Sequence, residues 1–405
     1  MPIPGLLGNK KEMKYIKYMP YHSMKGASRN RREISAALEC GYQVSAFSRD
    51  TSRENTLLPD SVEIMYDGEV LFNYSTPKWK RVLLILRNYI VILVRTTRLD
   101  ADVLSCHDLK ALNMAYWGTC WKRKKPKLIY DSHEFELGRN AKRSRLQRLW
   151  IKWQERFLMR RCAFSIMVND SIADEVQRIH KLKQRPIVVR STPEKWIIDT
   201  SEIQRVQAEF RKVFGNENPI LMYHGAVTPG RGIEKLLEIV KNMPEVNAVI
   251  LGDGAEPYMN SLKKTAEEYG ITKRIMFHPA VSIRELWKYV GAADIGMLTI
   301  PAVAKSYYYM LPNKLFENVH SGTPIIGSDF PETSRLVKQY GLGLLCDPDS
   351  TEDICACVNK MLADKELYNT CKRNTLNAKE ELCWEKEKII LKDAFRCHLE
   401  GNAAK

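Results

Sequence analysis

Short apolar runs alternate with helical patterns through the second half of the chain. Such runs have the length of buried strands. The predicted strands are Ile220 to His224, Asn247 to Leu251, Arg274 to His278, Ile295 to Thr299, Pro324 to Gly327 and Leu342 to Cys346. The helices predicted between them cover about 231–242, 255–269, 282–291, 313–320 and 332–340. Ser282 and Glu285 are spaced as a capping box at the start of the third helix. This regular alternation predicts a parallel sheet with helices on both faces.

The first half of the chain follows the same pattern less regularly. The strands predicted here are Gln43 to Phe47, Asp102 to Cys106, Leu128 to Tyr130 and Ala163 to Val168. Helices are predicted from about Arg29 to Glu39, through the apolar stretch at residue numbers in the eighties and nineties, and from about 141 to 161. This pattern indicates a second doubly wound domain.

Polar residues around one amphipathic helix, from about Thr192 to Asn218, mark the boundary between the two domains. We therefore expect an N-terminal domain at 1–195, a linker at 196–217 and a C-terminal domain at 218–380. A helix at 381–405 is expected to pack back toward the N-terminal domain through the apolar stripe Trp384, Leu391, Phe395 and Leu399. Ligands of open α/β sheets bind outside the carboxyl ends of the strands, so that is where we expect the site.

The charge of the chain is concentrated in one half. The net charge is +15, yet residues 1–200 hold 37 basic and 21 acidic residues, whereas the remainder holds 26 and 27. Such asymmetry favours an anionic partner, which could be nucleic acid, an acidic membrane surface or a phosphorylated substrate. A basic face that only contacts water is the alternative. The composition itself excludes disordered, collagenous and coiled-coil chains.

The ten cysteines form no Cys-x-x-Cys pair and have no histidine at zinc-finger spacing, so we interpret them as reduced thiols of a cytosolic protein. The first twenty residues lack the apolar core of a signal peptide. The most apolar stretch, Val82 to Val94, contains Arg87 and Asn88 and is shorter than the roughly twenty residues that span a bilayer. It is predicted to be a buried or surface-docked helix.

A glycine-rich turn with one arginine is the first candidate site. Tyr223-His224-Gly225 ends a predicted strand, and Pro229-Gly230-Arg231-Gly232 opens the next helix. Backbone N–H groups at a helix N-terminus attract phosphate, and a guanidinium can bind two phosphate oxygens. Because glycine and arginine are common at helix starts, the pattern alone leaves a purely structural turn open.

The second candidate site is the segment Leu311 to Glu317. Pro312 leaves free N–H groups at the start of a helix that ends at Ser321-Gly322, Lys314 adds a positive charge, and Glu317 follows about one turn later. A carboxylate can accept two hydroxyl hydrogen bonds, as in the binding of a ribose diol. The alternative is a surface glutamate on an amphipathic helix.

The third candidate site pairs His107-Asp108 with His133-Glu134, each directly after a predicted strand. These groups could bind a sugar or serve as acid, base or hydrogen-bond donor, although a histidine at a strand end is often structural. No helix carries two histidines at zinc-binding spacing, and we expect no metal here.

The helix predicted between Lys142 and Arg161 has two stripes. The apolar stripe consists of Leu146, Leu149, Trp150, Trp153 and Phe157. The basic stripe consists of Arg145, Arg148, Lys152, Arg156 and Arg160. A tryptophan-rich face beside a basic one is typical of a helix at an anionic lipid surface. Packing of the apolar stripe on the sheet of the first domain is the alternative.

Taken in chain order, these segments resemble the family-4 retaining glycosyltransferases, which use nucleotide-activated sugars. The resemblance runs from about Arg29 to Phe395 and is carried by ADVLSCHDLKAL, KLIYDSHEFEL, ILMYHGAVTPGRGIEKLLE, VILGDGAE, RIMFHPAV and LPNKLFENVHSGTPII. The last segment is similar to an LPNKxFE-type subgroup. The implied fold is α/β of the GT-B type, with two Rossmann-like, doubly wound parallel-sheet domains facing across a cleft and a helical C-terminal tail.

The resemblance also implies roles for individual residues. Arg231 and Lys314 would contact the donor diphosphate, Glu317 would hold the ribose, and His107 would reach the donor sugar. Main-chain atoms around Ala280 and Val281 would lie near the base, and Gly26 would approach the phosphates, in a stretch that departs from the family's glycine-rich pattern. The implied catalytic residues are His107, Arg231 and Lys314. The implied donor-binding residues are Gly26, Gly225, Arg231, Val281, Asn313, Lys314 and Glu317.

Two positions depart from the family pattern. Tyr309 stands where many members have a glutamate facing the donor sugar, and Ala226 stands where many have a second phosphate-binding arginine. Members with the LPNKxFE-type segment share this reduced form, so we do not interpret it as inactivation.

The implied function is transfer of a sugar, with retention and without metal, from a UDP- or GDP-sugar to a glycan or lipid-linked acceptor in cell-surface polysaccharide or glycoconjugate synthesis. We expect no further cofactor and no nucleic-acid partner, in a cytoplasmic enzyme attached peripherally to an anionic inner membrane face. The alternatives are a nucleotide-sugar 2-epimerase of the same fold and a catalytically idle scaffold.

Overall fold

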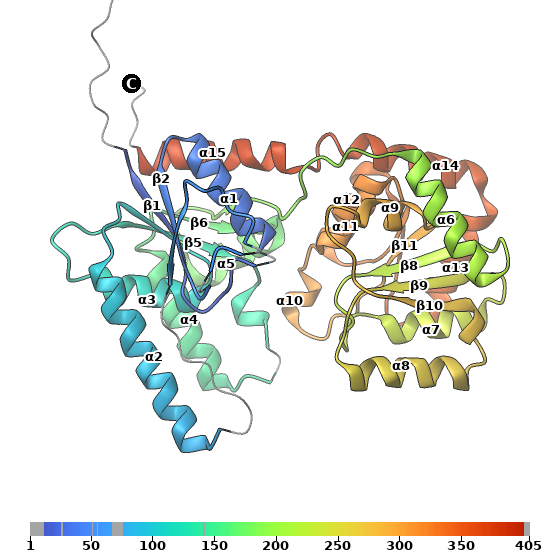
Figure 1. The fold of residues 1–405 in the computed structure, drawn as a ribbon, viewed down its shortest axis with the longest axis horizontal. Coiled ribbons are helices and arrows are strands. Elements are labelled where there is room, and N and C mark those ends of the chain that lie inside the picture. Colours follow the sequence, from blue (N-terminus) through green and yellow to red (C-terminus); the bar gives the residue numbers. More distant parts are fainter. Residues whose placement is uncertain are drawn as a thin grey trace, which may run out of the picture. The chain divides into compact units, whose positions relative to one another are not determined.

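A computed structural model of the chain describes residues 12–25, 27–50, 52–54, 56–66, 76–140 and 142–400. The chain divides into two compact units, each with its own parallel sheet (Figure 1). Unit 1 draws on Met1–Leu137, Arg143–Arg190 and Glu387–Lys405, and unit 2 draws on Gly138–Lys142 and Ser191–Lys386.

The sheet of unit 1 has seven parallel strands in the order β3-β2-β1-β4-β5-β6-β7. Their bounds are β1 Lys14–Met19, β2 Gln43–Ser48, β3 Glu63–Tyr66, β4 Val103–Cys106, β5 Lys127–Ser132, β6 Phe164–Met167 and β7 Ile187–Val188. The sequence predicts β2, β4, β5 and β6. It does not predict β1, because the lysine in the middle of this strand interrupts the apolar pattern. Lys17 is in fact fully buried. The strand order reverses at β1, so the carboxyl ends of β1 and β4 form a topological switch point.

Among the described residues of unit 1, six helices accompany this sheet, together with a 3-10 turn at Glu136–Gly138. They are α1 Ser28–Glu39, α2 Lys78–Arg98, α3 Leu109–Thr119, α4 Arg145–Met159, α5 Asp170–His180 and α15 Trp384–Leu399, which belongs to this unit from Glu387 onward. Side-chain caps start α3 and α5, where Asp108 accepts from the Ala111 N–H at 2.7 Å and Asn169 accepts from the Ile172 N–H at 2.9 Å. These two helices are not among those predicted from the sequence.

The sheet of unit 2 has six parallel strands in the order β10-β9-β8-β11-β12-β13. Their bounds are β8 Ile220–His224, β9 Asn247–Leu251, β10 Ile275–His278, β11 Ile295–Leu298, β12 Ile325–Ser328 and β13 Gly343–Cys346. Each predicted strand is confirmed, with ends displaced by no more than one residue. The switch point of this unit lies between β8 and β11, which pair directly.

Nine helices and a 3-10 turn at Thr272–Arg274 belong to unit 2 within the described residues. They are α6 Thr200–Phe214, α7 Ile233–Asn242, α8 Glu256–Glu268, α9 Leu286–Gly291, α10 Lys305–Tyr308, α11 Asn313–Ser321, α12 Pro331–Tyr340, α13 Thr351–Ala363 and α14 Lys365–Ala378. The predicted capping box is wrong. The Ser282 hydroxyl accepts from the Arg284 N–H two residues on, and α9 begins only at Leu286.

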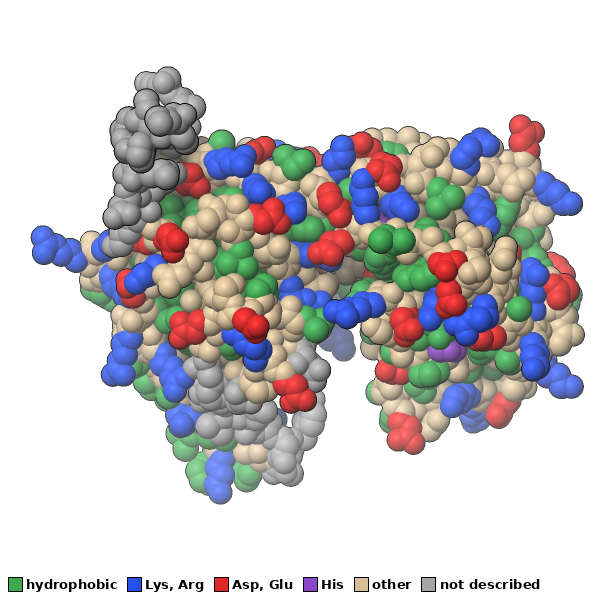
Figure 2. All heavy atoms as spheres, turned by 45° about the horizontal axis from the view of Figure 1, so that its top comes forward, with side chains coloured by type: hydrophobic (Ala, Val, Ile, Leu, Met, Phe, Trp, Pro, Cys, Tyr) green, Lys and Arg blue, Asp and Glu red, His purple; other side chains and the backbone are tan. Residues whose placement is uncertain are grey.

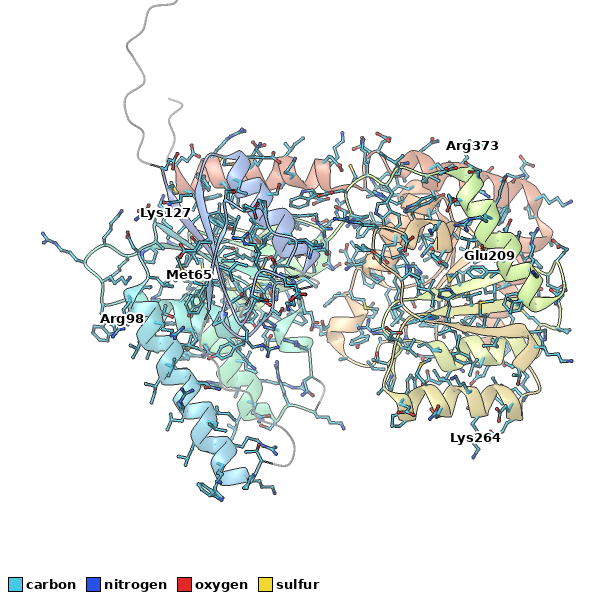
Figure 3. The ribbon with its side chains drawn as sticks, in the orientation of Figure 1. Met65, Arg98, Lys127, Glu209, Lys264 and Arg373 are labelled. Carbon is cyan, nitrogen blue, oxygen red and sulfur yellow. The ribbon has the colours of Figure 1, made fainter. Side chains whose placement is uncertain are left out.

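From Glu387 onward, the C-terminal helix α15 packs on unit 1 through buried apolar residues that include Phe395. The four predicted stripe residues, from Trp384 to Leu399, are all buried. The Phe395 ring packs edge-on against Tyr15, with 5.6 Å between the ring centroids. Lys127, labelled in Figure 3, donates to the Leu399 carbonyl at 2.6 Å and so satisfies the end of the helix.

Helices α2 and α4 leave most of their apolar side chains exposed. Only Asn88, Ile92 and Thr96 of α2 are buried, and α4 packs inward through Glu155, Leu158 and Met159. Packing of the tryptophan stripe of α4 on the sheet is therefore wrong, because Leu146, Leu149, Trp150 and Trp153 are exposed. Among the described residues no helix is both long and apolar enough to cross a membrane.

Candidate functional site

The loop after β8 forms one wall of the candidate site in unit 2. The Tyr223 hydroxyl donates to the Ala226 carbonyl at 2.6 Å, and the Val227 N–H donates to the Asp253 carbonyl at 2.9 Å. These bonds hold the chain in a tight turn directly past the carboxyl end of the strand. The loop that was predicted to bind phosphate is thereby fixed at the switch point of the sheet.

Two glycines of this loop allow the backbone to approach its neighbours closely. Gly232 has φ +78°, and a Cβ there would lie 2.0 Å from the Thr299 carbonyl oxygen. Gly225 has φ +108°, and a Cβ there would lie 2.8 Å from Cε of Lys314. Other residues strain the backbone in this conformation. The loop and α7 can therefore lie against β11 and α11 only with glycine at these positions.

Lys314 lies in the first turn of α11, against the Gly225 backbone. Its Nζ is 3.9 Å from the centroid of the Tyr223 ring, a cation–π contact. Burial and the nearby Arg231 lower the pKa of Lys314 to about 7, whereas Glu317 acts to raise it. An anion bound here would favour the charged ammonium, so the site is suited to a phosphate group.

Arg231 stands between Gly230 and Gly232 just before α7. Its guanidinium carbon is 5.4 Å from the centroid of the Tyr307 ring, which belongs to the short helix α10. Neither α7 nor α11 has a side-chain cap at its N-terminus. Arg231, Lys314 and the N–H groups of two helix ends thus supply positive charge on one side of unit 2.

Glu317 is paired with His224, with 2.8 Å between its Oε2 and Nε2 of the histidine. His224 is almost completely buried at the end of β8, and Glu317 is only 15% exposed. A carboxylate has more acceptor positions than this one bond uses. His224 therefore orients Glu317 and leaves it able to accept hydroxyl hydrogen bonds.

The remaining donor-binding predictions are placed as follows. Asn313 is the exposed first residue of α11, and half-buried Val281 packs on the cluster that includes Val249 and Val290. The Ala280 N–H donates to Oδ1 of Asp253 at 3.1 Å. Gly26 lies outside the described residues.

In unit 1 the structure brings the two predicted histidines together. His107 and His133 follow β4 and β5, which are parallel neighbours, and their ring centroids are 4.1 Å apart. A third ring, that of His22 after β1, lies 4.7 Å from His107, and its Nε2 is 3.0 Å from Oδ2 of Asp108. Three imidazoles therefore form one cluster at the switch point of this sheet.

Asp131, fully buried, is the hub beneath the cluster. Its carboxylate contacts Nε2 of His133 at 2.9 Å, Nη2 of Arg29 at 2.8 Å and Nζ of Lys17 at 3.2 Å. Burial acts to raise the pKa of Asp131, but Arg29, His133 and Lys17 hold it well below its usual value. Lys17 also donates to Glu33, so two buried cations face two carboxylates.

The two inner histidines are neutral. Burial, and then the proximity of His133, lower the pKa of His107 to about 2, and burial also lowers the pKa of His133. Nδ1 of His107 faces Oδ1 of Asn30 at 3.1 Å, so Nδ1 donates and Nε2 remains an acceptor. His133 donates to Asp131 through Nε2, which leaves Nδ1 as an acceptor. Both rings are suited to accepting hydrogen bonds from hydroxyl groups.

The predicted partner acids behave differently from one another. Asp108 caps α3 and contacts His22 through its carboxylate, whereas for Glu134 the backbone carbonyl accepts from Oγ of Ser132 at 2.8 Å. Sequence reasoning missed Tyr307, His22 and Asp131, and it named His224 in the first candidate site without giving it a role. His224 and Asp131 lie at the carboxyl ends of predicted strands. That location could have indicated their roles.

The ten cysteines are all free thiols. In the part of the chain that the structure describes, no group of three or more His, Cys, Asp or Glu residues could hold a metal ion.

Comparison with known families gives two matches, one for each half of the chain. The model for Glycosyltransferase Family 4 matches residues 28–192, and the model for Glycosyl transferases group 1 matches residues 205–378. Together they cover most of the chain and include every described candidate residue except His22 and Lys17.

Individual relatives are distant. The chain is 22% identical over 228 residues to alpha-D-kanosaminyltransferase of Streptomyces kanamyceticus, covering 55% of this chain and 57% of that protein. It is 22% identical over 182 residues to D-inositol 3-phosphate glycosyltransferase of Xylanimonas cellulosilytica, covering 44% and 42%. The chain thus spans about half the length of the curated relatives it matches.

Solved structures match over nearly the whole chain. Anabaena HepE in complex with UDP and glucose has a TM-score of 0.73 at 14% identity, covering 96% of this chain and all of that one. Sucrose-phosphate synthase from Thermosynechococcus elongatus has a TM-score of 0.75 at 16% identity, covering 95% and 98%. At such identities the likeness is one of fold.

Proposed function

Because the chain belongs to the glycosyltransferases of the GT-B fold, we propose that it transfers a sugar from a nucleoside diphosphate to a glycan or lipid-linked acceptor. The observation that carries the proposal is the arrangement in unit 2, where Arg231, Lys314 and two uncapped helix N-termini adjoin Glu317. Solved structures of the same fold include one that holds UDP and glucose.

In this proposal, Arg231 and Lys314 stabilise the leaving diphosphate. Breaking the bond between the anomeric carbon and the phosphate oxygen develops negative charge on that oxygen. The guanidinium, the ammonium and the N–H groups of α7 and α11 can stabilise this charge, which makes a metal ion unnecessary. Lys314, whose pKa is about 7 in the free protein, becomes fully charged as the diphosphate binds.

Glu317 and His107 bind hydroxyl groups in the same proposal. Glu317, oriented by His224, accepts from the ribose hydroxyls of the nucleotide. His107 is neutral, so it binds a sugar hydroxyl through Nε2 rather than acting as an acid. The proposed reaction retains the anomeric configuration, with the acceptor attacking on the face that the nucleotide leaves. Tyr309 and Ala226 leave the donor sugar unspecified.

The acceptor is proposed to be lipid-linked, in a cytoplasmic enzyme of cell-surface glycan synthesis. The basic first half of the chain supports this proposal, because lipid-linked acceptors lie at anionic membrane surfaces. Relatives named for lipid or polyprenol substrates include alpha-monoglucosyldiacylglycerol synthase of Streptococcus pneumoniae, 28% identical over 108 residues.

The test is a thermal-shift screen with UDP- and GDP-sugars, followed by turnover with an added acceptor. A bound donor stabilises the native protein, so the correct nucleotide raises the melting temperature. Arg231→Ala and Glu317→Gln should abolish this shift, whereas Arg205→Ala, on the surface of α6, should retain it. Wild-type turnover by Arg231→Ala would exclude the assigned site.

The same assay separates the two alternatives. Conversion of the donor sugar to its 2-epimer without any acceptor would indicate an epimerase. Donor binding without hydrolysis or transfer would indicate an idle scaffold.

A further inference from the structure

Helix α2 presents an apolar face away from the rest of unit 1. Asn88, Ile92 and Thr96 form its buried side. Its exposed large apolar side chains are Trp79, Val82, Leu83, Ile85, Leu86, Tyr89, Ile90 and Val94. At about 100° per residue, Leu83 and Ile90 point directly away from the buried side. Figure 1 shows the first half of this helix projecting from the unit.

Basic residues border this face, and α2 contains no acidic residue. Lys80, Arg87 and Arg98 share one edge of the apolar face and are all exposed. Arg98, labelled in Figure 3, marks the end of the helix nearer the sheet. An apolar face with a cationic edge and no anionic group is the composition of helices that lie in a lipid headgroup layer.

Helix α4 repeats this arrangement. Its exposed apolar residues lie opposite buried Glu155, and Leu146 is 78% exposed. Arg145, Lys152 and Arg156 follow one edge of this face. Glu155, the one acid of the helix, points inward and bonds to Tyr130 at 3.0 Å and His180 at 2.9 Å. The outer side of α4 therefore carries apolar and basic side chains and no acidic one.

Helix α3 joins the two faces. A Cβ on Gly118 of α3 would lie 2.6 Å from Cγ2 of Thr96, so these helices touch closely. On the other side, stacked rings run from Trp150 through Trp153 and Phe157 of α4 to Trp117 of α3. Trp121, just after α3, is 84% exposed. Five of the eight tryptophans thus lie on these three helices or next to them.

We propose that this surface, the exposed faces of α2 and α4 with Trp117 and Trp121, inserts into the headgroup layer of an anionic phospholipid bilayer. Figure 2 shows hydrophobic and basic side chains side by side at the lower end of unit 1. The occupant is a bilayer rather than a second copy, because two copies meeting through this surface would bring like charges together. The idea that the membrane presents a lipid-linked acceptor rests on the proposed function. Binding of the surface to a membrane does not, and it is tested separately.

The experiment is flotation of the full chain with phosphatidylcholine vesicles containing about 30% phosphatidylglycerol, beside vesicles of phosphatidylcholine alone. The wild-type protein should float with the anionic vesicles, and its tryptophan emission should shift to the blue. Leu83→Ser with Ile90→Ser should reduce the bound fraction by about tenfold or more, since both side chains lose their contact with lipid. Lys80→Gln with Arg87→Gln and Arg98→Gln should weaken binding by about a hundredfold.

Matched controls lie elsewhere on the surface. Ile389→Ser with Ile390→Ser removes two exposed isoleucines of α15, and Lys263→Gln with Lys264→Gln and Lys360→Gln removes three charges from unit 2. Both control variants should float as the wild-type protein does. Their loss of binding, wild-type binding by the α2 variants, or equal flotation with neutral vesicles would overturn the proposal. A dimer in lipid-free solution that the α2 variants abolish would overturn it in favour of a second copy.

Thermal shifts with nucleotide sugars, measured without vesicles, keep the two proposals apart. A variant of α2 that loses flotation should retain the donor shift. Flotation without any donor shift would leave the membrane surface standing and remove the proposed function.

Discussion

Lys314 makes donor binding depend on pH. In the free protein the pKa of this lysine is about 7, because burial and Arg231 disfavour the charged form. A bound diphosphate favours that form and raises the pKa. Below pH 7 the ammonium is already present, whereas above it binding must take up a proton. We expect the affinity for UDP or GDP to fall by up to about tenfold per pH unit above 7, measured by calorimetric titration from pH 6 to pH 9.

The arginine variant isolates this effect. Lys314→Arg keeps a positive charge throughout this range, since a guanidinium does not deprotonate in proteins. Above pH 7, where the terminal phosphate of UDP or GDP is also ionised, its affinity should be independent of pH. Calorimetry in buffers of different ionisation enthalpy should then show no net uptake of protons on binding. An equal slope in Lys314→Arg would assign the pH dependence to another group.

Asp131 carries the buried charge balance of unit 1. Asp131→Asn leaves Arg29 and Lys17 buried with one carboxylate fewer, which should cost about 3–5 kcal/mol of unfolding free energy. The carboxylate pKa is held well below its ordinary value by these cations, so the stabilisation is present above that ordinary value and is lost only as pH falls through the lowered folded pKa. Urea unfolding of the variant at pH 7 should show the lower midpoint.

Asp174→Asn is the matched control, because its pair with Arg185 is exposed. Exposed pairs contribute about 0–1 kcal/mol, so this variant should unfold close to the wild-type midpoint. Equal midpoints for the two variants would mean that Asp131 does not neutralise the buried cations.

Among the elements, the start of α7 depends on Gly232. An alanine there would combine a left-handed φ with a Cβ 2.0 Å from the Thr299 carbonyl oxygen. We expect Gly232→Ala to lower unit 2 stability by roughly 3 kcal/mol or more and to displace Arg231, with loss of the donor thermal shift.

Gly270→Ala separates conformation from contact. Gly270 has a similar φ of +67°, but a Cβ there would meet nothing within 4 Å. It should cost only about 1–2 kcal/mol and leave donor binding intact. The difference between the two variants measures the contact with the Thr299 carbonyl, just after β11.

The elements that sequence reasoning predicted well are those whose apolar runs are uninterrupted. All strands of unit 2 fall in this class. β1 was missed because Lys17 breaks its apolar pattern, and only the folded chain supplies Glu33 and Asp131 as partners. The orientation of α4 also escaped prediction, because helical spacing groups its tryptophans without revealing which side meets the sheet.

The candidate site was predictable to the same extent. Strand ends identify Gly225, His107 and His133, because they follow local patterns. The pairing of His224 with Glu317 joins residues 93 positions apart in the sequence. Tyr307 lies in a four-residue helix with no periodicity to find. Contacts of this kind depend on the topology and not on local spacing.

For the whole molecule, the predicted fold class is confirmed. Each unit is a doubly wound parallel sheet, and solved chains of the same fold match nearly the whole chain. The charge is divided between the halves, with the basic excess in the half that contains α2 and α4. The bilayer is thus assigned to unit 1 and the nucleoside diphosphate of the donor to unit 2, and the two units differ in their electrostatics.

This division predicts different responses to salt. The basic edges of α2 and α4 are exposed to solvent. The Debye screening length falls to about 4–5 Å as the salt concentration rises from about 0.1 M to about 0.5 M. Vesicle binding should therefore fall steeply, by about tenfold or more, over that range. The nucleotide site is less accessible to ions, because Lys314 is largely buried and Glu317 is only 15% exposed, so UDP or GDP binding should weaken less. Both are measured on the same preparation, by flotation and by thermal shift. Parallel losses would show that nucleotide binding, too, depends on diffuse surface charge, whereas salt-independent flotation would mean that apolar insertion alone holds the protein on the vesicle.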